Sequence, residues 1–193
     1  MKIAIINYGA GNIQSIKFAI QRQGYEATLT NDPNQIQLAD KVIFPGVGEA
    51  SSAMQKLKAS GLDTLIPKLR QPVLGICLGM QLMCAFSEEG QTQGLGIFDV
   101  KVKRFNNKNK VPQIQWNTIR NLKSLLNKNV IENSFIYMVH SYYAPVTKDT
   151  IAVSDYGGEY TAAFAKSNFY ATQFHPEKSG KVGEQILNNF LEL

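Results

Sequence analysis

The chain has 193 residues, enough for one domain with a substantial core. Hydrophobic residues make up 44% and charged residues 18%, which is typical of a compact soluble protein and excludes a disordered one. No apolar stretch is long enough to cross a bilayer, so we expect no membrane association. The apolar start of the chain runs directly into Asn7-Tyr8-Gly9, which favours a first strand over a signal peptide.

The formal charge of +5 gathers partly in residues 101–110. This run holds a single aromatic residue among lysines and asparagines, so it favours a solvated hairpin loop over a nucleic-acid site. A docking surface for an acidic partner remains a second interpretation.

The two cysteines, Cys77 and Cys84, are seven residues apart. On one helix they would lie roughly 10 Å apart along the axis, too far for a disulfide. Two free thiols indicate a reducing compartment, so we expect a cytoplasmic protein. For Cys84 we expect the role of a small buried apolar residue.

The first half of the chain alternates short apolar runs with helical patterns. The expected strands are residues 2–7, 25–30, 41–44 and 73–77. The expected helices begin near residue 12, cover residues 54–69 around a break at Gly61, and follow residue 77 through Ala85 and Phe86. This order predicts parallel β–α–β units buried on both faces.

After about residue 90 the pattern changes to closely spaced strands. The expected strands are residues 97–104, 113–119, 134–140, 151–154, 161–166 and 169–174, and only 121–126 and 182–193 favour helix. Close turn signals predict antiparallel hairpins. The predicted fold is therefore α/β, with a mostly parallel central sheet flanked by helices and an antiparallel extension. We expect a single domain over residues 1–193.

Cys77 lies at the point where an apolar strand turns into a helix, with Gly75 and Gly79 two residues away on either side. This is the cysteine counterpart of the nucleophile elbow, whose glycines let a strained turn pass close to neighbouring backbone. We expect the start of the helix to favour the thiolate form of the cysteine. The pattern predicts a nucleophile.

A thiolate nucleophile needs a base, and His140 and His175 are the two histidines of the chain. In His175-Pro176-Glu177 the proline favours an extended backbone, which places imidazole and carboxylate on the same side. A carboxylate beside a histidine is the arrangement of a base and its orienting group. His140 lacks such a carboxylate, so we expect a structural or substrate-proximal role for it. Each motif alone is common, but together they favour nucleophilic catalysis.

Pro45-Gly46-Val47-Gly48 ends the third expected strand, at the same sheet edge as the elbow. Glycines here allow main-chain N–H groups to turn toward a ligand and stabilise the oxyanion of an acyl-transfer intermediate. A simple turn explains the same residues equally well.

Taken in order along the chain, these motifs resemble the class I, triad-type glutamine amidotransferases. Further motifs resemble the branch of that family formed by the glutaminase subunits of imidazole glycerol phosphate synthases. They are Asn7-Tyr8-Gly9-Ala10-Gly11-Asn12, Pro45-Gly46-Val47-Gly48, Trp116-Asn117, His140-Ser141-Tyr142 and His175-Pro176-Glu177-Lys178-Ser179. The resemblance covers nearly the whole chain and implies the flavodoxin-like fold of the family.

The resemblance also implies roles for individual residues. Cys77 attacks the side-chain amide of glutamine, His175 is the general base and Glu177 orients it. The remaining implied roles are oxyanion donors at Gly46, Val47, Gly48 and Leu78, glutamine contacts at Gln81, Glu89, Ser141 and Tyr142, and partner contacts at Asn12, Trp116, Tyr137 and Lys178. The implied partner is a (βα)8-barrel cyclase subunit that forms a heterodimer with the chain and uses the ammonia. No metal, cofactor or nucleic acid is implied.

The chain departs from the usual pattern at Gln113, where many relatives carry His, and at Gln115, where Gly is usual. These changes leave open a paralogue that supplies ammonia to a cyclase-like partner for the modification of surface sugars. A more distant alternative is a non-catalytic or redox protein with an elbow cysteine.

Overall fold

The computed structural model describes residues 1–9, 13–106 and 109–193. Its α-helices in these ranges are α1 (Ile13–Arg22), α2 (Pro33–Gln37), α3 (Ala50–Ala59), α4 (Leu62–Leu65), α5 (Leu78–Met83) and α6 (Gly180–Glu192). Short 3-10 helices cover Ile66–Lys68, Glu89–Gln91, Leu125–Asn127 and Pro176–Lys178. None of the helices in the described part of the chain is long and apolar enough to cross a membrane.

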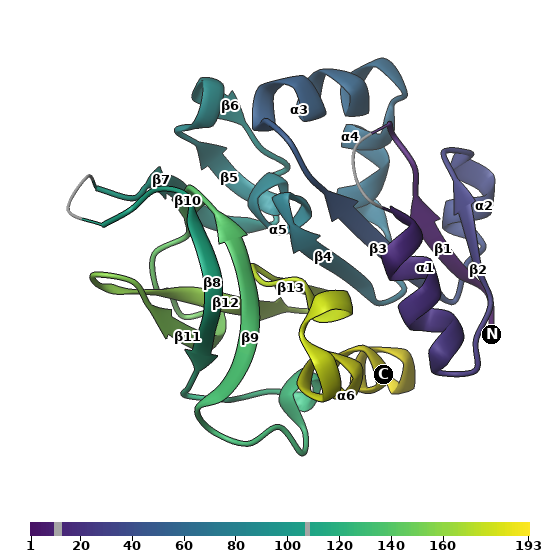
Figure 1. The fold of residues 1–193 in the computed structure, drawn as a ribbon. Coiled ribbons are helices and arrows are strands. Elements are labelled where there is room, and N and C mark those ends of the chain that lie inside the picture. Colours follow the sequence, from purple (N-terminus) through teal and green to yellow (C-terminus); the bar gives the residue numbers. More distant parts are fainter. Residues whose placement is uncertain (10–12, 107–108) are drawn as a thin grey trace.

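A seven-stranded sheet in the order β11-β12-β13-β4-β3-β1-β2 forms the centre of the fold (Figure 1). Its strands are β1 (Ile3–Ile6), β2 (Ala27–Thr30), β3 (Lys41–Gly46), β4 (Val73–Cys77), β11 (Thr150–Asp155), β12 (Glu159–Lys166) and β13 (Phe169–Thr172). The pairs from β2 to β13 are parallel, and β12 and β11 add an antiparallel edge. The predicted mostly parallel sheet with an antiparallel extension is confirmed.

Two smaller sheets lie beside the central one. The first has the order β10-β7-β5-β6, with β5 (Cys84–Ser87), β6 (Thr92–Gln93), β7 (Phe98–Arg104) and β10 (Tyr142–Tyr143). The second is an antiparallel ribbon of β8 (Gln113–Ile119) and β9 (Ser134–His140). β5, which the sequence analysis placed in a helix, pairs in parallel with β7.

Two apolar clusters cover the two faces of the central sheet. Along β1, Ala4 and Ile6 pack into one cluster and Ile3 and Ile5 into the other, as alternation along a strand requires. The first cluster includes residues of α3, α4 and α5, and the second includes residues of α1 and α6 together with the β8–β9 ribbon. This double coverage buries β1, β3 and β4 along their whole length and fixes the positions at which they end.

Two helix predictions are wrong. The helix after Cys77 ends at Met83, because Cys84 has an extended backbone and begins β5, which pairs with β7. The two cysteines therefore do not share a helix. Residues 121–126 form no α-helix: Asn121 and Ser124 have positive φ angles of 57° and 72°, and the Glu132 carboxylate accepts hydrogen bonds from the first amides of the segment. Only Leu125–Asn127 forms a 3-10 turn there.

Candidate active site

The turn at Cys77 has the strained geometry of a nucleophile elbow. Cys77 ends β4 with φ 55° and ψ −110°, and α5 begins at the next residue. A β-carbon on Gly75 would lie 2.7 Å from the Met83 sulfur, and one on Gly79 would overlap the main-chain oxygen of Phe44. Only glycine at these two positions lets the turn sit this close to β3 and α5, as the sequence pattern predicts.

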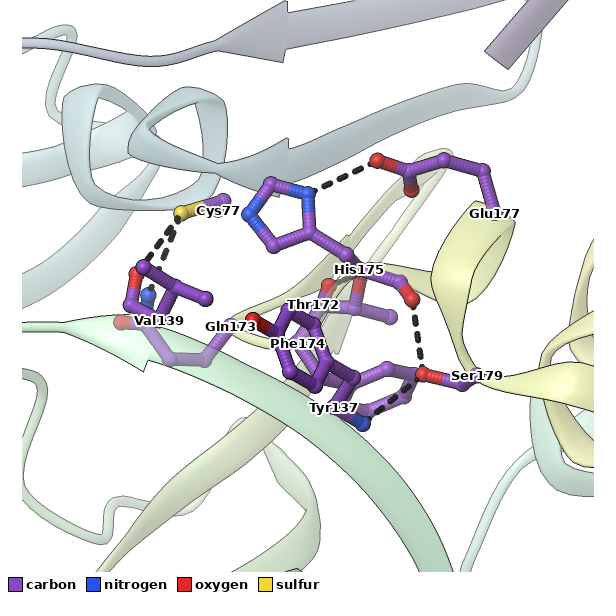
Figure 2. A network of polar contacts seen from close by, with 9 residues as sticks. All are labelled: Cys77, Tyr137, Val139, Thr172, Gln173, Phe174, His175, Glu177 and Ser179. Atoms are coloured by element: carbon purple, nitrogen blue, oxygen red, sulfur yellow. Dashed lines mark hydrogen bonds and ion pairs between the residues drawn. The ribbon is translucent and has the colours of Figure 1, made fainter. Parts of the chain in front are cut away.

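The Cys77 sulfur is nearly enclosed but faces a cavity. Its residue is 7% exposed, and its sulfur lies 3.8 Å from the main-chain oxygen of Val139 and 3.9 Å from Nε2 of Gln173. Figure 2 shows the sulfur on one side of the His175 imidazole and Glu177 on the other. The three side chains therefore stand in line, in the order thiol, imidazole and carboxylate.

His175 and Glu177 form a buried pair. Nδ1 of His175 lies 2.8 Å from Oε1 of Glu177, and the two side chains are only 7% and 3% exposed. The backbone of His175 is extended, as the following proline favours. Its carbonyl accepts a hydrogen bond from the Ser179 hydroxyl (Figure 2). Its N–H donates to the carbonyl of Tyr137 on β9. The ring is thus held with Nδ1 on the carboxylate and Nε2 available to the sulfur.

The two histidines have opposite pKa shifts. Burial alone would lower the pKa of His175, but hydrogen bonds to Cys77 and Glu177 raise it by more, to about 10. Burial lowers the pKa of His140 to about 4, against a hydrogen bond to the carbonyl of Tyr142. At neutral pH His175 therefore carries a proton beside the sulfur, whereas His140 is neutral. This difference favours His175 as the group that exchanges protons during catalysis.

The glycine loop after β3 lies next to the elbow. Gly46 is paired directly with Cys77 in the β3–β4 register. Beyond this last pair, Val47 is 41% exposed and Gly48 has a φ of 95° with open space around it. The buried Tyr8 hydroxyl donates to the carbonyl of Pro45 at 3.0 Å, and burial together with the charge of Cys77 raises the pKa of Tyr8. The hydrogen bond from Tyr8 holds the loop at Pro45, whereas Gly48 has open space around it.

A cavity of about 300 Å³ opens over the sulfur, at the lower end of the range for small-molecule sites. The predicted site residues that line it together are Val47, Gly48, Cys77, Leu78, Gln81, Glu89, Ser141, Tyr142, His175 and Lys178. Glu89 is the anionic group of this wall. Burial raises its pKa, and its Oε2 accepts a hydrogen bond from the N–H of Ala50.

The predicted partner contacts lie at the mouth of the cavity and on the outer face of the β8–β9 ribbon. Trp116 is 51% exposed, and its ring contacts that of Tyr137, its cross-strand neighbour. Lys178 is exposed and lines the cavity. Asn12 lies outside the described residues. The structure adds Ile114, 58% exposed on the same strand as Trp116, which the sequence analysis did not single out.

Two groups that lie beside the Cys77 sulfur were not identified from the sequence. One is the main-chain carbonyl of Val139, for which the sequence carries no signal. The other is Gln173, which is fully buried. In an extended segment residues two apart point to the same side, so the spacing of Gln173 and His175 was a usable signal.

Cys84 is fully buried, and burial raises the pKa of its thiol. It therefore has the properties of a packed, unreactive residue. Among the described residues, no group of three or more histidine, cysteine, aspartate or glutamate side chains is arranged to hold a metal ion.

Comparison with known proteins identifies the family. The class-I glutamine amidotransferase family model matches residues 4–193. The chain is 59% identical to imidazole glycerol phosphate synthase subunit HisH of Bacteroides fragilis over 196 residues, covering 100% of both chains. The HisH subunit of Haemophilus influenzae is 46% identical, with 100% of this chain and 98% of that protein covered.

Solved structures share the fold at low sequence identity. A putative GMP synthase protein from Thermoplasma acidophilum has a TM-score of 0.76 and 19% identity, covering 100% of this chain and 92% of that one. PurLQS from Thermotoga maritima has a TM-score of 0.73 and 15% identity, covering 99% and 97%. By family model and by full-length identity, the chain belongs to the class-I glutamine amidotransferases and, within them, to the HisH subunits of imidazole glycerol phosphate synthase.

Proposed function

We propose that the chain hydrolyses glutamine to glutamate and ammonia through a thioester on Cys77, and that the ammonia serves imidazole glycerol phosphate synthesis in histidine biosynthesis. The observation that carries the proposal is the line of Cys77, His175 and Glu177 at the floor of a cavity of about 300 Å³. The chemistry needs no cofactor, and a biosynthetic role of this kind belongs in the cytoplasm.

In the first half-reaction the Cys77 thiolate attacks the carbonyl carbon of the glutamine side chain, and the C=O electron pair moves to oxygen. N–H groups of the Val47–Gly48 loop and of Leu78 stabilise this oxyanion. When the intermediate collapses, the C–N bond breaks and the proton of His175 goes to the nitrogen, so that ammonia leaves. Glu177 keeps Nδ1 protonated throughout and stabilises the charge on the ring.

In the second half-reaction water attacks the thioester while His175 takes one of its protons. The S–C bond then breaks, glutamate leaves, and the thiolate and protonated imidazole are restored. The raised pKa of His175 suits the resting state, because the proton that ammonia needs is already on the ring.

Ammonia made without an acceptor is wasted, so we infer that the oxyanion donors are misaligned until the partner and its nucleotide bind. The support is the loop after β3: its last sheet pairing is Gly46 with Cys77, and Gly48 beyond it is unconfined. Val47 and Gly48 lie between this pairing and the N-cap of α3 at Glu49, and because neither is part of the sheet ladder their amides can turn at little cost. High glutamate release by the isolated chain would count against this inference.

For the partner we propose a (βα)8-barrel cyclase subunit, which uses ammonia to make imidazole glycerol phosphate and an aminoimidazole carboxamide ribotide. The exposed apolar side chains of Ile114 and Trp116 on β8 support docking on this ribbon, and Ile114 is paired with Val139, which lines the cavity. Lys178, exposed and lining the cavity, adds a charge for an acidic group of the partner.

The decisive experiment measures glutamate release with and without the co-encoded cyclase and its nucleotide, and labels the nucleophile with a diazo-ketone analogue of glutamine. We expect the label on Cys77 and none in Cys77→Ala. A label on Cys84 would overturn the assignment of the nucleophile. Release of ammonia that an added cyclase does not incorporate would instead favour a paralogue with another acceptor.

A further inference from the structure

A continuous chain of buried amide hydrogen bonds links the wall of the cavity to the catalytic sulfur. Nε2 of Gln81 lies 2.9 Å from the main-chain oxygen of Tyr142 and 2.9 Å from Oε1 of Gln173. Nε2 of Gln173 in turn lies 3.9 Å from the Cys77 sulfur. Gln81 is 5% exposed and Gln173 is fully buried. We infer that Gln173 is a further catalytic residue, which donates a hydrogen bond to the Cys77 thiolate and fixes the orientation of Gln81 toward the substrate.

The direction of this chain is set by a main-chain group. The oxygen of Tyr142 can only accept, so Gln81 must turn its NH2 group toward it. The same NH2 group faces Gln173, so Gln173 must present its carbonyl oxygen there and its own NH2 group to the sulfur. Both side-chain amides are thus oriented by their partners, although nitrogen and oxygen of an amide are otherwise easily exchanged.

The consequence for Cys77 follows from the kinds of groups that surround the sulfur. Gln173 donates, and a donor stabilises a thiolate more than a neutral thiol, because hydrogen bonds to charged acceptors are the stronger ones. The carbonyl of Val139 accepts, so it interacts favourably only with the protonated thiol. Gln173 is therefore a neutral donor that favours the reactive form of the sulfur, in addition to protonated His175.

The consequence for the substrate follows from Gln81. Its NH2 group is engaged inside the protein, so the polar atom that remains for a ligand in the cavity is its carbonyl oxygen. An acceptor at this place selects a ligand that offers N–H groups, such as the amide or ammonium of glutamine. This step rests on the proposed glutaminase function, whereas the contact with the sulfur does not.

The two roles are separated by two substitutions. Gln173→Glu keeps an oxygen for Gln81 but replaces the donor at the sulfur by a carboxylate oxygen, whereas Gln173→Met removes both. We measure the rate of Cys77 alkylation by iodoacetamide from pH 6 to 9 on the full chain, and KM and kcat for glutamine in the complex with the co-encoded cyclase. We expect alkylation at neutral pH to fall about tenfold or more in both variants, at the lower end of what a hydrogen bond to a charged group contributes. We expect KM to rise clearly only in Gln173→Met.

Gln113→Met is the control for removing a fully buried glutamine, because the hydrogen bond of Gln113 is accepted by its Oε1 from the Tyr160 hydroxyl and does not involve Cys77 or Gln81. It should leave the alkylation rate unchanged. If folded Gln173 variants are alkylated at the wild-type rate across the pH range, Gln173 is only structural and the inference is wrong. If alkylation falls while the glutamine analogue fails to label even the wild-type chain in its complex with the cyclase and the nucleotide, the hydrogen bond to the sulfur stands and the glutaminase function fails.

Discussion

His140→Asn tests whether the second histidine is neutral, on which the assignment of the proton-transferring role to His175 depends. His140 is 6% exposed, and its Nδ1 lies 2.8 Å from the carbonyl of Tyr142, so this nitrogen carries the hydrogen. Asparagine offers an N–H group in a similar place but does not titrate. The substitution therefore removes the charge equilibrium while keeping the donor.

The expected magnitude comes from the depressed pKa of His140. Burial lowers this pKa from 6.5 to about 4, with a smaller effect in the same direction from His175. At about 1.4 kcal/mol for each pKa unit, the difference between 6.5 and about 4 corresponds to roughly 3 kcal/mol of unfolding free energy. Between pH 6.5 and pH 4 the unfolded chain binds a proton at this histidine and the folded chain does not. The contribution of neutral His140 to the stability of the fold is therefore complete well above pH 6.5 and is lost as the pH falls to about 4.

The assay is urea unfolding of the wild-type chain and His140→Asn at intervals from pH 4 to pH 8. A constant offset between the two curves of unfolding free energy against pH reports the packing lost in the variant. Only a difference in their slopes tests whether His140 is held neutral in the folded chain. His175 is present in both chains, so its own titration contributes equally to the two curves and cancels in their difference. If the difference in unfolding free energy stays constant from pH 7 to pH 4, His140 is not held neutral and the reasoning is refuted.

Three further substitutions test other parts of the site. Glu177→Gln keeps the shape of the side chain but removes the charge beside the His175 imidazole. The kcat for glutamate release should therefore fall by about 10³–10⁴-fold while the fold stays intact. A loss below tenfold would show that Glu177 does not orient His175. Gly79→Ala drives a methyl group into the main-chain oxygen of Phe44 and should cost about 3 kcal/mol or more in denaturant unfolding. Trp116→Ala should weaken binding to the proposed cyclase partner at least tenfold by calorimetry. Ile131→Ala should not, because Ile131 is 77% exposed in the loop before β9; equal effects would argue against docking on the ribbon.

The parts of the site that were predictable from the sequence are those fixed by local backbone rules. Gly75 and Gly79 flank Cys77 because no other residue tolerates the close approach of the turn to β3 and α5. Pro176 keeps His175 extended as predicted, but Pro176–Lys178 forms a 3-10 helix, so Glu177 reaches the imidazole from a helical turn and not along an extended segment. Such rules act over two or three residues, so one sequence is enough to read them.

The errors arise where distant parts of the chain decide the local structure. Residues 84–87 continue a helical pattern, but pairing of β5 with β7 and β6 makes them a strand. The acceptor at the sulfur belongs to Val139, 62 residues away, and it is a main-chain carbonyl that every residue type possesses. Gln173 was overlooked because a glutamine in an apolar strand gives no sign of its partners until Gln81 and Cys77 are placed around it.

The β8–β9 ribbon is a sheet of its own, and it meets the catalytic segment through main-chain groups. The carbonyl of Tyr137 accepts from the N–H of His175, and its N–H donates to the hydroxyl of Ser179. Such bonds do not depend on which side chains the hairpin displays outward. Selection can therefore exchange the outward residues to match a new acceptor enzyme without retuning the catalytic centre. New outward-facing side chains can therefore be grafted onto this hairpin when the chain is engineered as an ammonia-supplying module for other synthases.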